Sequence, residues 1–157
     1  MKTILFVVDG SPLACAASYE VIYLAKASPS KIIAQFIIDP QRLFDLQGFE
    51  GEGLCGSGVF IETEQELIPP LVRLGETLLM SFTARAEGAG VDVEVFVDVG
   101  NPAREIASRA TDCDLVALPA TAANSTLSNE LVDLIACPIL LVQSQIDGML
   151  LEPKAAA

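Results

Sequence analysis

The chain opens with the stretch TILFVVDGSP, residues 3–12, in which an uncharged and mostly apolar run ends at Asp9 and Gly10. Such a run is typical of a strand that is buried on both faces of a parallel sheet. Asp9 and Gly10 predict a turn, Ser11 predicts a helix N-cap, and Pro12 suits the first position of that helix. The stretch therefore predicts a strand, a turn and a helix, which is the repeating unit of α/β proteins.

Four further apolar runs predict strands, and helical patterns separate them. The third run alternates valine with acidic residues, which indicates one buried face, one solvated face and a position at the edge of the sheet. The order βαβαβαβαβ predicts the α/β class, a single doubly wound parallel sheet with helices on both faces. We expect this domain over residues 1–143, followed by a C-terminal tail, 144–157. The predicted strands are residues 3–8, 31–38, 91–98, 115–118 and 139–142.

Composition narrows the classes of function. The 157 residues carry a net charge of −12, and the nine basic residues are scattered singly, so we expect no nucleic-acid binding. The sequence contains no histidine, which removes the usual general base and the commonest metal ligand. We therefore predict no catalytic residue and no metal site, and we favour a binding or regulatory protein over an enzyme.

The sequence also indicates where the protein is expected in the cell. The first residues, Met1–Leu5, hold one basic residue and no cleavage-like end, and no apolar run reaches the ~18 residues that a membrane span needs. The four cysteines form no C-x-x-C pair, which is typical of reduced thiols. We expect a cytoplasmic protein with no membrane association.

Four segments together resemble the universal stress protein family in order and spacing. They are ILFVVDGS at 4–11, GNPA at 100–103, DLVAL at 114–118 and ACPILLV at 136–142. The resemblance implies a five-stranded sheet in the order 3-2-1-4-5, and commonly a homodimer formed through the last strand, Ile139–Val142. That strand carries no charge, so a partner strand would cover an otherwise unprotected edge.

Many members of this family bind ATP between the first and fourth strands, where a glycine-rich loop wraps the phosphates. Here the loop departs from the family pattern, because Pro119 and Ala122 stand at the places of the first two glycines, and Ser125-Thr126 at the place of the last. The loop is several residues too short and holds no Lys or Arg, and Pro119 has no N–H to donate. We expect Ser125 to cap the next helix, and we expect no ATP binding in the family's usual mode.

An adenine-nucleotide cleft, for ATP or AMP, is the alternative. The resemblance implies that Asp9 would approach the adenosine and that Ile37 would supply an apolar contact from the second strand. Ser125, Thr126 and Ser128 lie at a predicted helix start, where an anion could bind. Each residue also has a structural explanation, because Asp9 can cap its own turn and capping accounts for at least one of the hydroxyls.

The glycine-rich segment 41–63 has no assigned role. Residues 51–56 fit G-x-G-x-x-G, but the motif needs a strand before it and a helix opening within it, and neither is evident. We interpret the segment as a flexible loop. The alternative is an apolar lid over the cleft, formed by Phe44, Phe49 and Phe60.

Three functions follow in order of preference. The first is a dimeric regulatory or binding protein of the universal stress type that takes a small ligand or a protein partner, without ATP in the usual mode. The second is an adenine-nucleotide sensor or weak ATPase that uses the candidate cleft. The third is an enzyme of another α/β group, such as an ATP pyrophosphatase. It is disfavoured because residues 9–12 lack the required Ser-Gly-Gly-x-Asp-Ser type of loop.

Overall fold

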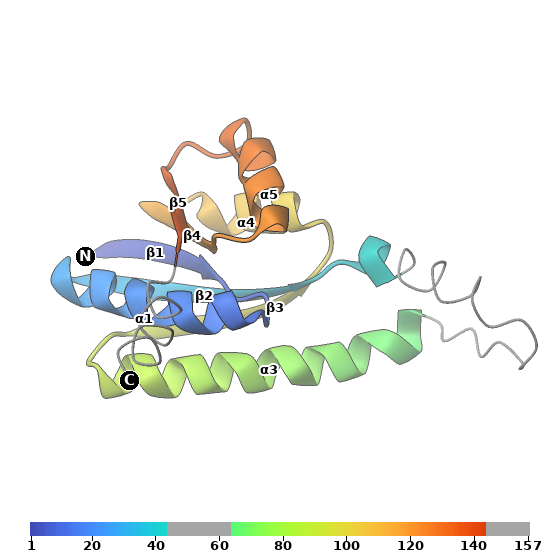
Figure 1. Ribbon diagram of the computed structural model, residues 1–157, viewed down its shortest axis with the longest axis horizontal. Helices are drawn as coiled ribbons and strands as arrows, with labels where there is room; N and C mark the ends of the chain where they lie inside the picture. Colours follow the sequence, from blue (N-terminus) through green and yellow to red (C-terminus); the bar gives the residue numbers. More distant parts are fainter. Residues whose placement is uncertain (44–63, 144–157) are drawn as a thin grey trace, which may run out of the picture.

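The computed structural model describes residues 1–43 and 64–143, which form alternating strands and helices (Figure 1). All strands pair in parallel, in the order β3-β2-β1-β4-β5. This confirms the predicted α/β class and the sheet order 3-2-1-4-5, with β3 at one edge and β5 at the other. The elements are β1 (Lys2–Val7), α1 (Pro12–Ala27), β2 (Ser30–Ile38), α3 (Glu64–Gly88), β3 (Val93–Val99), α4 (Pro102–Ala110), β4 (Leu115–Pro119), α5 (Ala122–Val132) and β5 (Ile139–Val142).

Helices cover both faces of the sheet. Figure 1 shows α1 and α3 on one side and α4 and α5 on the other. Side chains from β1 alternate between the two sides, as a pleated strand requires. Phe6 packs toward α1 and α3, while Leu5 and Val7 pack toward α4 and α5. The uncharged run at the start of the sequence is therefore apolar throughout because both of its faces are buried.

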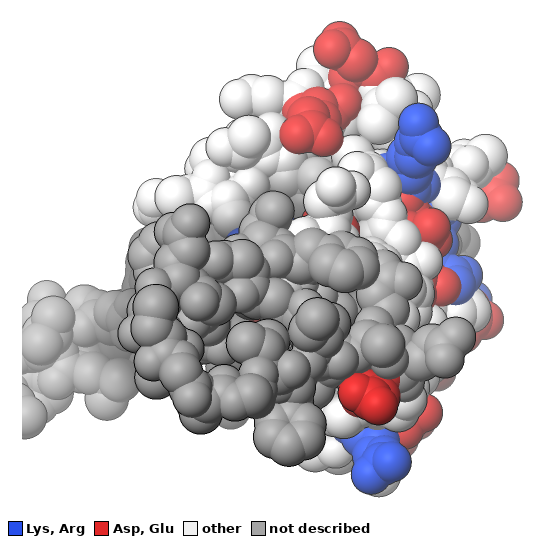
Figure 2. Space-filling view, turned by 90° about the vertical axis from the view of Figure 1, so that its right-hand side faces the viewer, with Lys and Arg blue, Asp and Glu red and all other residues white. Residues whose placement is uncertain are grey.

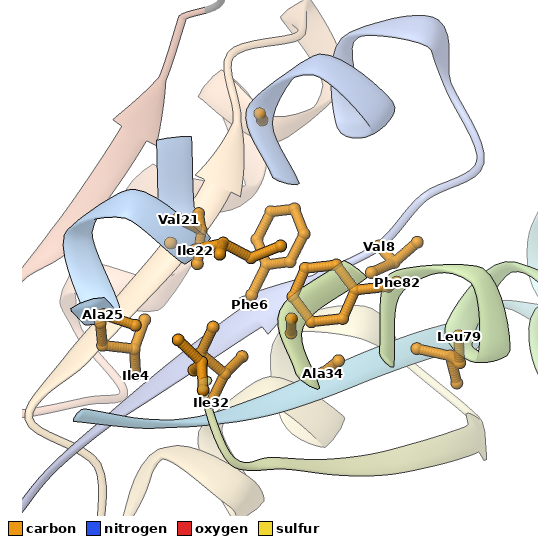
Figure 3. Close-up of a cluster of buried hydrophobic side chains, with 14 of the residues drawn as sticks. Ile4, Phe6, Val8, Val21, Ile22, Ala25, Ile32, Ala34, Leu79 and Phe82 are labelled. Carbon is orange, nitrogen blue, oxygen red and sulfur yellow. The ribbon is translucent and has the colours of Figure 1, made fainter. Parts of the chain in front are cut away.

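The core on the α1 and α3 side centres on two aromatic rings (Figure 3). The ring centroids of Phe6 and Phe82 lie 5.4 Å apart, and both side chains are fully buried. The helix α3 comes so close to the sheet that Gly75 has no room for a side chain. A Cβ added at Gly75 would lie 2.4 Å from Cδ1 of Phe36 on β2.

Local signals set most of the helix starts. Ser11 caps α1 as predicted, because its Oγ accepts a hydrogen bond from the backbone N–H of Ala14 at 3.0 Å. Asn101 caps α4 in the same way through the N–H of Arg104. Pro12 and Pro102 occupy the first positions of these two helices, where their fixed φ angle suits the helix.

The prediction for the start of α5 was wrong. Thr121, not Ser125, is the N-cap, since its side chain accepts a hydrogen bond from the N–H of Asn124 at 3.1 Å. The helix therefore begins at Ala122, one turn earlier than predicted. Only residues 120 and 121 connect it to β4, so the connection expected over residues 119–124 is shorter still.

Two further boundaries differ from the sequence expectation. The third strand starts at Val93, because Val91 still belongs to the turn after α3 and its N–H donates to the carbonyl of Ala86. The helical residues 40–43 extend the chain beyond β2. The glycine motif, the three phenylalanines of the suggested lid and the C-terminal tail lie outside the described residues.

Candidate functional site

The candidate site is a cleft of about 490 Å³ at the carboxyl ends of β1 and β2. In this sheet order the chain leaves β1 toward β2 on one side and later adds β4 on the other, so the strand order reverses between β1 and β4. Ligands of open α/β sheets bind at such a reversal. The starts of α4 and α5 flank the cleft, through Asn101 and Ala103 and through Ala123 and Asn124.

The floor of the cleft is apolar and its rim is charged. Apolar lining comes from β1, β2, α4 and α5: Val7, Val8, Phe36, Ile37, Ala103, Ile106 and Leu127. The ionisable residues that line it, within the part of the chain that the structure describes, are three acids and one base: Asp9, Asp39, Glu130 and Arg42. A ligand with an apolar or aromatic body and a small polar end matches this distribution.

Asp9 is held by the turn between β1 and α1. Its Oδ1 accepts hydrogen bonds from the backbone N–H of Ser11 at 2.9 Å and from the Ser11 hydroxyl at 2.6 Å. Gly10 has a φ of +76°, in the left-handed region that favours glycine. Asp9 therefore does cap its own turn, as the structural explanation of this residue predicted. Asp9 is still solvent-exposed and lines the cleft, so contact with a ligand remains open to it.

Asn124 joins the ends of β1 and β4. Its Nδ2 donates to the carbonyl of Pro119 at 2.8 Å and to Oδ2 of Asp9 at 3.2 Å. The side chain is almost fully buried, with 6% exposure. One amide therefore fixes the short β4–α5 connection to the turn that carries Asp9. The sequence analysis did not single out Asn124.

Arg42 is the second residue that the sequence analysis missed. It lies in the helical residues 40–43 beyond β2 and lines the cleft. In the sequence, Arg42 lies far from the segment after the fourth strand where the family's phosphate loop is expected. In Figure 2, which views the molecule from the side toward which β1 and β2 run, red and blue groups are interspersed over the described surface. Among the described residues that Figure 2 leaves uncovered, the blue groups lie apart from one another.

The structure brings three of the five predicted site residues into the cleft. Asp9, Ile37 and Thr126 line it, whereas Ser125 and Ser128 are not among its lining residues. All three hydroxyls bond back to carbonyls of their own helix or its cap: Ser125 Oγ to Thr121 at 3.1 Å, Thr126 Oγ1 to Ala122 at 3.5 Å and Ser128 Oγ to Ser125 at 2.8 Å. None of them stands at the helix start, so the geometry that suggested an anion site at Ser125 is absent.

A polar network fastens α4 and β3 together on the same side of the sheet. The Arg109 guanidinium donates to both carboxylate oxygens of Asp98, at 2.6 and 2.7 Å, and lies over the ring of Phe96. Hydrogen bonding to Arg109 lowers the pKa of Asp98, burial opposes this, and a hydrogen bond from Gln35 adds to it. Gln35 also donates to the carbonyl of Glu105, so the network ties together β2, β3 and α4.

The described residues place no group of three or more acidic or cysteine side chains where they could hold a metal ion. The two cysteines beside β4 and β5, Cys113 and Cys137, are half-buried, and burial raises the pKa of both thiols, that of Cys113 to about 11. Such thiols stay protonated and unreactive near neutral pH.

No helix within residues 1–43 and 64–143 is long and apolar enough to cross a membrane.

The sheet order, the two helical layers and the cleft at the strand reversal define a doubly wound α/β protein. The family model "Universal stress protein family" matches residues 1–143. The chain belongs to the universal stress protein family, as the sequence resemblance implied. No curated protein is detectably similar in sequence.

Solved structures agree on the fold. A universal stress family protein from Burkholderia pseudomallei is 18% identical, with a TM-score of 0.68 over 91% of this chain and 96% of that one. One from Arabidopsis thaliana with AMP bound is 13% identical, with a TM-score of 0.64 over 94% of this chain and 95% of that one. One from Archaeoglobus fulgidus in complex with dAMP is 12% identical, with a TM-score of 0.58 over 91% and 98%.

Proposed function

We propose that this protein is a regulatory, non-enzymatic member of its family that binds a nucleoside monophosphate such as AMP in the β1–β4 cleft, and does not hold a triphosphate. The observation that carries the proposal is the two-residue connection between β4 and α5, residues 120 and 121. A loop that wraps three phosphates must offer several backbone N–H groups in a wide arc. This connection is too short to form that arc.

The donors that remain suit one phosphate. Pro119 has no N–H, and the N–H of Asn124 is already bonded to the side chain of Thr121. Ala123, in the first turn of α5, lines the cleft, and a helix start favours a nearby anion. A single phosphate there would also feel the positive charge of Arg42.

The acidic rim disfavours a longer phosphate tail. Asp9, Asp39 and Glu130 all line the cleft, and among the described lining residues Arg42 is their only basic counterpart. Each further phosphate adds negative charge to a cleft that these carboxylates line, and like charges within one cleft repel each other. The apolar floor suits an adenine ring. Structures of the same fold with AMP and with dAMP support a monophosphate as ligand.

Isothermal titration calorimetry with adenosine, AMP and MgATP tests the proposal. We expect AMP to bind at least about tenfold more tightly than MgATP, which corresponds to about 1.4 kcal/mol. Ala123→Trp fills the cleft and should abolish AMP binding. Ala122→Trp is the matched control, since Ala122 is exposed on the same helix turn but does not line the cleft. Micromolar binding of MgATP without AMP binding would overturn the proposal.

The proposal that the protein is not an enzyme needs a separate assay. The cleft offers carboxylates and one arginine, and the whole sequence has no histidine to move a proton near neutral pH. We expect no release of phosphate from MgATP above the uncatalysed background. Turnover that disappears in Ala123→Trp and persists in Ala122→Trp would make the protein an ATPase.

We also propose that two chains pair through β5. Leu140 and Leu141 are 40% and 37% exposed on an edge strand that carries no charge, and Val132 and Leu134, which precede this strand in the chain, are also exposed. A two-fold partner strand would bury this surface. Light scattering should give about twice the 16.6 kDa chain mass, and Leu140→Lys should give the monomer. A monomeric wild-type protein at micromolar concentration would exclude the dimer.

A further inference from the structure

The other edge of the sheet carries a groove that the cleft does not use. The groove lies between α3 and β3, has a volume of about 630 Å³ and has mostly apolar walls. Met80 on α3 is 72% exposed and Val95 on β3 is 45% exposed, and both line it. Apolar side chains this exposed and this close together mark a surface that another molecule covers.

The backbone of β3 is open along the same groove. Asp92 accepts a hydrogen bond from the N–H of Ile32, and Gly100 donates to the carbonyl of Ile38, both at 2.9 Å. Since backbone groups alternate in direction along a strand, the N–H and C=O groups of Val95 and Val97 point away from β2. Within the described residues β3 pairs only with β2, so these groups face no other strand.

The charged residues that line the groove indicate which kind of strand would bind there. Glu76 and Glu87 line its two ends on α3, no lining residue is basic, and neither glutamate has an ion pair within the described residues. They are eleven residues apart, which is about 16 Å along a helix, so two lysines on one face of a strand, six residues or about 20 Å apart, can reach both with their long side chains. Arg73 lies one turn before Glu76 and does not line the groove.

A second copy of this chain fits poorly. Pairing β3 with its own copy would bring the glutamates of one groove toward those of the other, and like charges across an interface oppose association. A strand with apolar side chains and a basic residue near each end would instead satisfy the apolar walls, the open backbone and both carboxylates.

We propose that the α3–β3 groove binds an extended segment of a partner protein by strand addition to β3, the segment carrying alternate apolar side chains and a lysine or arginine near each end. Backbone hydrogen bonds to Val95 and Val97 supply register, and the apolar side chains enter the groove. Glu76 and Glu87 select basic over acidic segments.

Fluorescence anisotropy with two labelled peptides tests this on the full chain. The basic probe is Lys-Thr-Val-Thr-Val-Thr-Lys, which places its valines and lysines on one face, and the acidic probe has glutamate in place of both lysines. We expect the basic probe to bind about tenfold more tightly. The double variant Glu76→Lys with Glu87→Lys should reverse this preference. Equal binding of both probes, or binding of neither, overturns the proposal.

A second pair of variants tests strand addition itself. Val95→Pro removes an outward N–H that the β2–β3 ladder does not use, and should abolish binding of the basic probe, whereas Val95→Thr should keep it. Circular dichroism checks that both variants fold, and if Val95→Pro does not, the charge-reversal variant decides alone. Unchanged binding in a folded Val95→Pro overturns the proposal. A lower mass by light scattering for Val95→Pro than for Val95→Thr also overturns it, because the occupant would then be a second copy.

Discussion

The substitution Asn124→Asp replaces the side-chain amide at the junction of β1 and β4 with a carboxylate. It therefore turns a hydrogen-bond donor into an acceptor. In the wild type Nδ2 of Asn124 lies 2.8 Å from the carbonyl oxygen of Pro119 and 3.2 Å from Oδ2 of Asp9. A carboxylate of the same shape would face two acceptors and could donate to neither. The substitution should therefore lower the free energy of unfolding without leaving a cavity.

The magnitude follows from these contacts. The buried carbonyl of Pro119 loses its side-chain donor, which costs about 1–3 kcal/mol. Two carboxylates at the 3.2 Å distance repel by about 5 kcal/mol at an effective dielectric constant near 20. Asp9 is exposed, so water and a change of rotamer relieve much of this repulsion. We expect a loss of about 3 kcal/mol in the free energy of unfolding at pH 7.

The loss should depend on pH in one direction. Repulsion and burial raise the folded pKa of the introduced carboxyl group above its unfolded value near 4, so its ionisation destabilises the fold above that value. As the pH falls through the raised pKa, the group becomes protonated and can donate to Pro119 again. The deficit relative to the wild type should shrink to about 1 kcal/mol near pH 4.

Urea denaturation followed by circular dichroism at pH 7 and pH 4 measures this, with Asn124→Ala as the companion variant. Asn124→Ala loses the hydrogen bonds without adding a charge, so its deficit should be about 2 kcal/mol and nearly the same at both pH values. An Asn124→Asp protein as stable as the wild type at pH 7 would refute the role of Asn124. So would a deficit that stays constant between the two pH values.

Two further predictions concern the core and the α4 network. Asp98→Asn should cost about 2 kcal/mol at pH 7 by urea denaturation, because it leaves the guanidinium of Arg109 without its carboxylate. Since the pKa of Asp98 is lowered in the fold, this stabilisation is present above its ordinary value of 3.8 and is lost progressively as the pH falls from that value through the lowered one, and a deficit that did not shrink between pH 7 and pH 2.5 would contradict the ion pair. Gly75→Ala should lower the thermal midpoint by several degrees, because its Cβ would clash with the ring of Phe36, whereas Gly88→Ala in the same helix meets no atom within 4 Å and should not. Equal midpoints for the two glycine variants would refute the close approach of α3 to the sheet.

The fold was predictable because its signals are local. A run such as residues 3–8 has to be apolar throughout if both of its faces are buried, and the structure buries both. Ser11 was predicted as a cap because proline follows it directly, and Asn101, which was not predicted as a cap, carries the same signal. The edge position of β3 was readable from its alternation. The order of the strands came from the family resemblance, since local patterns do not specify which strands pair.

The site was less predictable, because its contacts join distant parts of the chain. Asn124 and Asp9 are 115 positions apart, and only the pairing of β1 with β4 brings them together. The sequence between Pro119 and Leu131 holds several hydroxyl and amide side chains that can each cap a helix, and propensity alone ranks Ser125 beside Thr121. A proline-terminated strand that needs its carbonyl satisfied was the signal that could have selected Asn124. Arg42 was missed because it follows β2, far along the chain from the loop that resembles the family's phosphate site.

The two edges of the sheet differ in a way that links the proposed dimer to the proposed groove. The β5 edge carries Ile139–Val142 and no charge, so it suits an identical strand across a two-fold axis. The β3 edge lies beside two glutamates, so it suits a basic strand and opposes its own copy. Because β3 and β5 are at opposite ends of the sheet, a dimer through β5 leaves both β3 edges free and far apart. Such a dimer would present two equivalent grooves, and a partner with two basic strands or two copies of itself would bind more tightly than a single strand through effective concentration alone.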